Sequence, residues 1–141
     1  YLSIEGCQVS FEVDEVLRRK RIADEYFENF KKYYKSGDFG KASEFLWGTV
    51  NNLVYALGLF EGEKLSKHDK VIKFLDRLAS IKADKEIAEG ISAAQLIHAN
   101  FYHNFMDKRL FDENRAKVEL LINKLGKMLI DKIQETKRVA T

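Results

Sequence analysis

The chain has 141 residues, of which 45% are hydrophobic and 33% are charged, and its net charge at pH 7 is +2. This length and composition indicate one globular domain, and they exclude a disordered chain and a protein that attracts nucleic acid through a strong overall positive charge. Because no apolar run approaches the roughly 18 residues needed to cross a bilayer, and because the one cysteine, Cys7, cannot form an internal disulfide, we expect a soluble protein of the reducing cytoplasm with no membrane partner.

The first part of the chain predicts a short extension followed by a helix. Residues 1–13 are expected to form an N-terminal extension, in which residues 8–13 (QVSFEV) alternate polar and apolar side chains as in a short strand. Residues 14–138 are expected to form a single helical domain, since proline is absent and long helices are permitted throughout. Apolar residues recur at three- and four-residue spacing over residues 14–35, which predicts an amphipathic first helix.

A second helix is predicted from residue 38 to about residue 60, with Asp38 as its N-cap. This segment is apolar on two sides, so we expect the helix to lie between neighbouring helices. Gly48, beside Trp47, is expected to let another backbone approach closely.

The remaining segments predict three more helices. Ser66 and Asp69 have the spacing of a capping box that begins a short third helix. A fourth helix is predicted over residues 84–105 and a fifth from about residue 112. Together these segments predict an all-α fold, an antiparallel up-and-down four-helix bundle with an additional short helix.

Histidines and asparagines gather near the end of the fourth predicted helix. Asn100 and His103 are three residues apart and therefore share a helix face. One hypothesis is that His103 faces a polar cleft and transfers a proton, while Asn100 holds a phosphate oxygen or fixes the histidine tautomer. The alternative is that both residues cap the helix end or hydrogen-bond there. His98 lies on another face and is a further candidate ligand contact. Its five-residue distance from His103, and the lack of a cysteine or carboxylate cluster, predict no metal site and no cofactor.

A second group of candidate ligand contacts precedes the third helix. His68 follows Lys64 and Lys67, and lysines beside a helix N-terminus can accept a phosphate. The alternative is that these side chains are simply solvated at the surface.

Two blocks of sequence carry a family resemblance. ASEFLWGTVNNL at residues 42–53 and SAAQLIHANFYHNF at residues 92–105, with Ser66 and His68, resemble the archaeal PaREP group within the HEPN superfamily, over about residues 22–129. The resemblance implies an up-and-down helical bundle. Since HEPN-like domains include metal-independent RNases and partners of nucleotidyltransferases that often act as dimers, it also implies a homodimer, a nucleotide or RNA ligand and a nucleotidyltransferase-type protein partner. The 10 Phe, 6 Tyr and one Trp also favour a dimer.

The resemblance implies an RNase signature, an arginine followed four to six residues later by a histidine. His103 fits the histidine position, but His98 stands where the arginine would be, and a neutral imidazole cannot replace a guanidinium at the transition state. We therefore favour a domain that binds a nucleotide, RNA or protein partner through a cleft bordered by Asn100 and His103. One alternative is an RNase with His103 as general base and Lys108 or Arg109 as the phosphate-holding cation beside the asparagine. Another is a structural bundle that associates through its second helix, which carries Trp47, or through a flat aromatic face.

Overall fold

The computed structural model describes the backbone of residues 2–140 and the side chains of residues 13–139. Over this part of the chain the protein has no strand and five α-helices, which are α1 (Leu2–Lys35), α2 (Phe39–Leu59), α3 (His68–Lys82), α4 (Lys85–His103) and α5 (Lys108–Ala140). The prediction of an all-α fold is confirmed.

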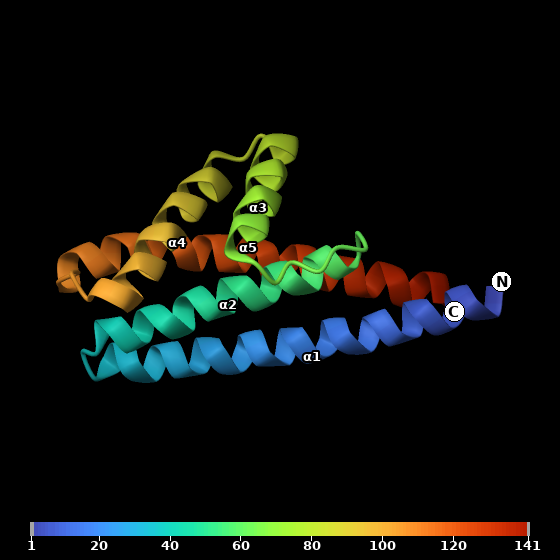
Figure 1. Cartoon of the computed structure of the whole chain (residues 1–141), viewed down its shortest axis with the longest axis horizontal. Helices are drawn as coiled ribbons and strands as arrows, with labels where there is room; N and C mark the ends of the chain where they lie inside the picture. Colours follow the sequence, from blue (N-terminus) through green and yellow to red (C-terminus); the bar gives the residue numbers. More distant parts are fainter. Residues whose placement is uncertain (1, 141) are drawn as a thin grey trace.

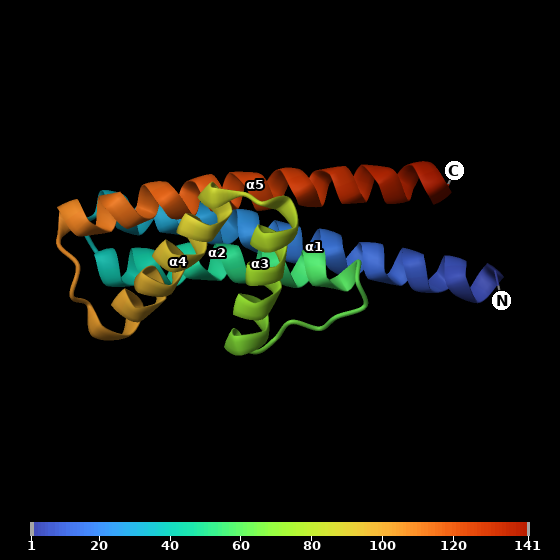
Figure 2. The ribbon, with the colours of Figure 1, turned by 90° about the horizontal axis from the view of Figure 1, so that it is seen from above.

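Three long helices form the body of the molecule. α1 runs antiparallel to α2 and to α5, whereas α2 and α5 run in the same direction (Figure 1, Figure 2). α3 and α4 are steeply inclined to these helices and form a hairpin on one side (Figure 1). Because α4 crosses the long helices instead of running alongside them, the predicted up-and-down four-helix bundle is not confirmed. The first turn of α1 and the last turn of α5 lie at the same end of the molecule.

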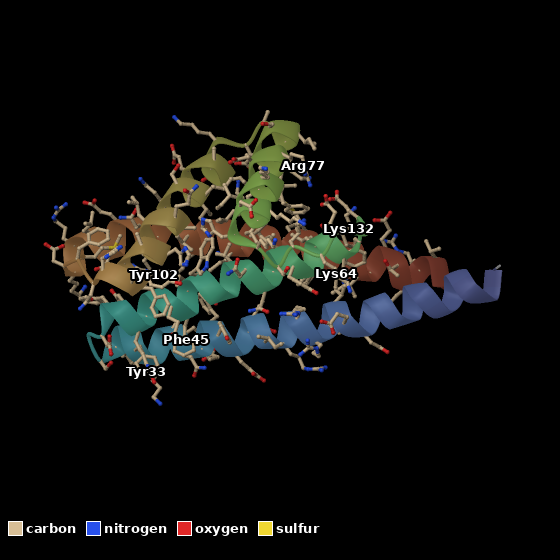
Figure 3. The ribbon with its side chains drawn as sticks, in the orientation of Figure 1. Tyr33, Phe45, Lys64, Arg77, Tyr102 and Lys132 are labelled. Atoms are coloured by element: carbon tan, nitrogen blue, oxygen red, sulfur yellow. The ribbon has the colours of Figure 1, made fainter. Side chains whose placement is uncertain are left out.

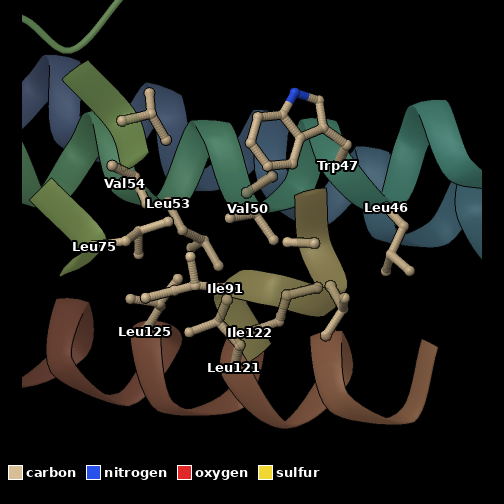
Figure 4. Packing of buried hydrophobic residues seen from close by; sticks show 14 of the residues in the cluster. Leu46, Trp47, Val50, Leu53, Val54, Leu75, Ile91, Leu121, Ile122 and Leu125 are labelled. Carbon is tan, nitrogen blue, oxygen red and sulfur yellow. The ribbon is translucent and has the colours of Figure 1, made fainter. Parts of the chain in front are cut away.

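The core is built around α2, which contacts all four other helices. Several of its buried side chains face α4 and α5 in Figure 4, where Leu53 and Val50 meet Ile91 and Leu121 from opposite sides. Full burial of a leucine or valine side chain contributes about 1.5–3 kcal/mol to stability. The expectation that the second helix lies between its neighbours is therefore confirmed.

Two glycines mark close contacts between helices. A Cβ atom on Gly48 would lie 2.2 Å from Cδ2 of Tyr26, so α1 places an aromatic ring over this glycine. The expectation of a close backbone approach at Gly48 is wrong, because the ring occupies that space. Close approach of two helices occurs instead at Gly90, where a Cβ atom would lie 2.7 Å from Cβ of Leu121 and 3.2 Å from the Lys117 carbonyl oxygen.

The N-terminal segment differs from its prediction. Residues 8–13 lie within α1, so the predicted strand is wrong. Six alternating residues are too few to separate a strand from a helix, and no proline interrupts the segment. Residue 1 and the side chain of Cys7 lie outside the described part of the chain, and the division into an extension and a domain at residue 13 stays a prediction. No helix in the described part is long and apolar enough to cross a membrane.

Two helix starts also differ. The N-cap of α3 is Lys67, whose side chain makes no capping hydrogen bond, so Ser66 does not begin this helix as predicted. α5 begins four residues before the predicted position, because Asp107 acts as the cap and accepts a hydrogen bond from the Leu110 backbone N–H at 2.8 Å.

Candidate functional site

Asn100 is fully buried and connects three segments of the chain. Its Nδ2 donates to Oγ of Ser43 at 2.9 Å and to the carbonyl oxygen of Phe39 at 3.4 Å, and its Oδ1 accepts from the backbone N–H of Met106 at 2.8 Å. Both ends of the amide are therefore engaged within the protein. His103, three residues later, is exposed, so the structure does not bring these two residues together at one cleft. This geometry favours the hydrogen-bonding alternative for Asn100.

The two cations predicted to hold a phosphate beside His103 are already paired. Nζ of Lys108 lies 2.7 Å from Oδ2 of Asp112, and Nη1 of Arg109 lies 2.8 Å from Oε1 of Glu113. Each pair joins residues one helical turn apart on α5. Both cations are exposed, and the structure gathers neither of them into the pocket described below.

The structure does bring together His68 and His98, from α3 and α4. Their ring centroids are 4.9 Å apart and the rings are stacked at 28°. His98 also stacks on Trp47 of α2, at 4.5 Å and 13°, and the ring of Tyr102 meets its edge at 5.2 Å. Figure 3 shows Tyr102 on α4 close to the crossing with α2. We call these four rings, Trp47, His98, His68 and Tyr102, the aromatic column.

The aromatic column lines a pocket of about 520 Å³, within the range of ligand pockets in proteins. The pocket lies between α1, α2, α4 and the connection from α2 to α3. Its polar side chains beyond the column are Arg19, Tyr26, Glu44, Asn51, Asn52, Tyr55 and Ser66.

Helix periodicity explains why α2 supplies most of this pocket. Glu44, Asn51 and Tyr55 repeat at three- and four-residue steps with Trp47 between them, so they share one face of the helix. Arg19 and Tyr26 of α1 are seven residues apart, or about two turns, and therefore also share a face. Sequence reasoning missed this polar and aromatic stripe, although its spacing is visible in the sequence.

Arg19 is held at the pocket by contacts on both helices. Its Nη1 donates to Oδ1 of Asn52 at 3.2 Å, its Nε donates to Oε1 of Glu15 at 3.2 Å, and its guanidinium lies 3.9 Å from the ring centroid of Tyr55. Nδ2 of Asn52 in turn donates to the carbonyl oxygen of Gly48 at 2.8 Å. These contacts fix the cation of α1 relative to the pocket face of α2.

Several polar groups at the pocket have no partner within the described part of the chain. Oδ1 of Asn51 is buried and accepts no hydrogen bond. The ring nitrogens of His68 and His98 make no hydrogen bond to a described residue, and the Glu44 carboxylate makes neither a hydrogen bond nor an ion pair there. The indole N–H of Trp47 is also unpaired among these residues, and Figure 4 shows it turned away from the core. The imidazole nitrogens, the Glu44 carboxylate and the indole N–H suit a polar ligand with a flat ring.

Electrostatics distinguish His98 from an ordinary surface histidine. Burial lowers its pKa below the usual value of 6.5, and the charge of His68 lowers this pKa further. His98 is therefore neutral at pH 7 and has one nitrogen that can accept a proton. Among the described residues no group of three or more His, Cys, Asp or Glu could hold a metal ion. The pocket's own side chains offer stacking, hydrogen bonding and proton transfer.

The predicted phosphate-binding group before α3 is only partly brought together. Ser66 and His68 line the pocket. Lys64 and Lys67, which are close to them in sequence, are exposed and do not line it. Lys64 lies near the C-terminal end of α2 (Figure 3). Neither lysine makes an ion pair with a described residue.

Comparison with known proteins adds one match. The sequence model of the archaeal PaREP1/PaREP8 family matches residues 18–122, a range that includes every residue lining the pocket. No curated protein and no solved structure gives a significant match.

Proposed function

The chain belongs to the archaeal PaREP1/PaREP8 family, and we propose that it binds a nucleotide, free or at an unpaired position of RNA, in the pocket of the aromatic column. The base stacks on the column, and the phosphate meets N–H and O–H donors around it. The observation that carries this proposal is the stacking of His68 on His98 beside Trp47. The ring nitrogens of both histidines have no hydrogen-bond partner among the described residues.

Stacking supplies the first part of the argument. Nucleic-acid bases stack on aromatic side chains, histidine included, with about 1–3 kcal/mol per base. The ring of His98 lies at 13° to that of Trp47 and at 28° to that of His68, whereas the rings of Trp47 and His68 are tilted by 41° with their centroids 5.2 Å apart. His68 and Tyr102 are exposed. A base can therefore reach the column from solvent.

Donors for a phosphate supply the second part. Arg19 and Ser66 line the pocket, and α3 begins directly after Lys67. No side chain of the N-cap bonds the first N–H groups of α3, and such groups together with the helix dipole favour an anion. Lys64 and Lys67 add positive charge at the same end of the helix.

We further propose that the family falls within the HEPN superfamily and that the protein acts in the cytoplasm as a homodimer with a nucleotidyltransferase-type partner. The two motif blocks support the superfamily assignment. The dimer is supported by exposed aromatic rings on and just after α4, since Tyr102 is 67% and Phe105 50% exposed. Sedimentation at micromolar concentration tests it, and a monomer there would count against the dimer.

A metal-independent RNase is the second candidate function, and the environment of His98 favours it. Two imidazoles 4.9 Å apart, one with a lowered pKa, can act as base and acid. His98 would take the proton of the ribose 2′-hydroxyl as its oxygen attacks phosphorus, and His68 would protonate the leaving 5′-oxygen. The hypothesis of His103 as the base stays a prediction, and the two assignments differ in which variant loses cleavage.

Binding of AMP, UMP and a short single-stranded RNA tests the proposed function. Trp47 is the one tryptophan of the chain and stacks on His98, so its fluorescence reports occupation of the pocket. We expect saturable binding by the wild type that weakens by about tenfold or more in His68→Ala, because a stacking contact and a donor are lost. His103→Ala is the matched control and should bind as the wild type does.

Absence of binding to all three ligands would refute the proposal. Incubating the same RNA with the protein and a chelator separates binding from catalysis. Cleavage that is lost in His98→Ala and kept in His103→Ala would assign the RNase to the histidine pair. The reverse pattern would assign it to His103.

A further inference from the structure

A second group of cations lies outside the pocket, where the end of α1 meets the start of α2. We infer that Lys32 and Lys41 hold a backbone phosphate of a single-stranded RNA, so that the ligand of the aromatic column is a strand and not a free nucleotide. This inference rests on the proposed nucleotide binding and deepens it, because it decides between the two forms of the ligand.

Tyr33 holds the two lysines on one surface. Nζ of Lys32 lies 5.6 Å from the centroid of the Tyr33 ring, and Nζ of Lys41 lies 5.7 Å from it. Contacts of this length attract an ammonium group to a ring but do not neutralise its charge. Both lysines are exposed, although they come from different helices. The surface therefore presents two positive charges that an incoming anion can reach.

No described acidic side chain pairs with these two cations. Neither of them makes an ion pair with a described residue, whereas Lys31 on the same helix lies 2.9 Å from the carboxylate of Glu28. The carboxylate of Asp38 caps α2 and accepts a hydrogen bond from the backbone N–H of Lys41. Glu44 lies one turn after Lys41 without an ion pair to it. Both ammonium groups thus remain available for a phosphate.

A row of aromatic rings joins this surface to the pocket. Tyr33 stacks on Phe45 at 5.4 Å and 4°, and the ring of Tyr26 meets Phe45 edge-on, also at 5.4 Å. Tyr26 lines the pocket, and all three rings are partly exposed. Figure 3 shows Phe45 on α2 beside Tyr33 on α1. Aromatic rings with cations beside them are the surface on which single-stranded nucleic acids bind.

The spacing along α1 shows why one nucleotide cannot use both groups of cations. Arg19, Tyr26 and Tyr33 follow one another at intervals of seven residues, or about two turns, so they share a face of α1. At about 1.5 Å per residue, the step from Arg19 to Tyr33 spans about 21 Å. A nucleoside monophosphate has one phosphate, which can meet Arg19 or the two lysines but not both. A strand has a phosphate between each pair of nucleotides and can therefore occupy both.

Two ligands with the same base test the inference on the wild-type protein. The affinities of AMP and of a short oligoadenylate RNA are measured by Trp47 fluorescence. Each phosphate contact made by a single strand contributes about 0.7 to the slope of log affinity against log salt, or about fivefold in affinity at about 0.1 M salt. We expect the oligoadenylate to bind more than about tenfold more tightly than AMP. Equal affinities would overturn the inference and leave the proposed nucleotide binding intact, whereas no binding of either ligand would overturn both.

A matched pair of double variants tests the two lysines. In Lys32→Gln/Lys41→Gln the oligoadenylate should bind about 25-fold more weakly, with a salt slope smaller by about 1.4, because two contacts are lost. AMP should bind as it does to the wild type. Lys31→Gln/Lys35→Gln removes the same charge from the opposite face of α1 and should leave both affinities within about twofold of the wild type.

Three outcomes of this comparison would contradict the assignment. The RNA affinity could survive the loss of Lys32 and Lys41, or it could fall equally in the two double variants, which would show a general effect of charge. A parallel loss of AMP binding in Lys32→Gln/Lys41→Gln would place the lysines at the phosphate of the single nucleotide, and the strand would no longer be needed.

Discussion

Replacing Asn100 with alanine should lower the free energy of unfolding by about 3 kcal/mol. The change removes hydrogen bonds to Ser43, Phe39 and Met106, and the residue is fully buried. Each such bond contributes about 1 kcal/mol, and a buried N–H left without an acceptor costs about 1–3 kcal/mol. The 3.4 Å bond to Phe39 contributes least. The loss of the two shorter bonds, together with the cost of the unsatisfied Met106 N–H, therefore adds up to about 3 kcal/mol.

Urea and thermal unfolding measure this loss. For a domain of this size, about 3 kcal/mol corresponds to a fall of about 10 °C in melting temperature. His103→Ala is the control on the same helix. We expect its melting temperature to stay within about 2 °C of the wild type, because the side chain is exposed and makes no hydrogen bond, ion pair or ring contact with a described residue. A stable Asn100→Ala variant that has lost ligand binding would show that Asn100 acts at a site and refute the structural reasoning.

Three further predictions concern other parts of the molecule. Hydrogen bonds from Lys108, Tyr34 and Arg115 lower the pKa of Asp112 to about 2. The stabilisation that this carboxylate provides is therefore complete above about pH 4 and is lost as the pH falls toward 2. Asp112→Asn should therefore be less stable than the wild type at pH 7 in urea unfolding, with a difference that shrinks below pH 4; a constant difference would contradict this. Gly48→Ala places a Cβ atom 2.2 Å from the Tyr26 ring and should cost about 1–3 kcal/mol, whereas an unchanged melting temperature would mean that the ring moves aside freely. Because burial and a neighbouring imidazole lower the pKa of His98, quenching of Trp47 fluorescence by its protonation should have a midpoint below 6.5 and disappear in His98→Gln. A midpoint at or above 6.5 would argue against this environment.

The helical fold could be predicted because its signals are local. Three- and four-residue spacing, caps such as Asp38 and Asp84 and the absence of proline identify all five helices. The start of α5 could not be fixed in this way, since Asp107 and Asp112 are both plausible caps. Tertiary contacts decide between them, because Asn100 binds the backbone just before Asp107. The inclination of α4 also depends on packing, with Gly90 against Leu121.

The candidate site was predictable only in part. His68 and His98 were candidate ligand contacts, but no local rule indicates that residues 30 positions apart will stack. The contact between these two rings depends on the path of the loop that connects α2 to α3, because this loop places His68 next to α4. The stripe of Glu44, Asn51 and Tyr55 could have been found from its spacing alone. It escaped notice because the apolar positions between these residues dominate the pattern of α2.

The contact of Tyr26 with Gly48 limits how the length of α1 can change. With this ring seated on α2, Arg19 reaches Asn52 from two turns earlier in α1. One residue inserted between positions 19 and 26 would rotate Arg19 by about 100° about the helix axis, and seven inserted residues would restore its direction but displace it by about 10.5 Å. Relatives that retain the pocket should therefore have the same number of residues between these two positions.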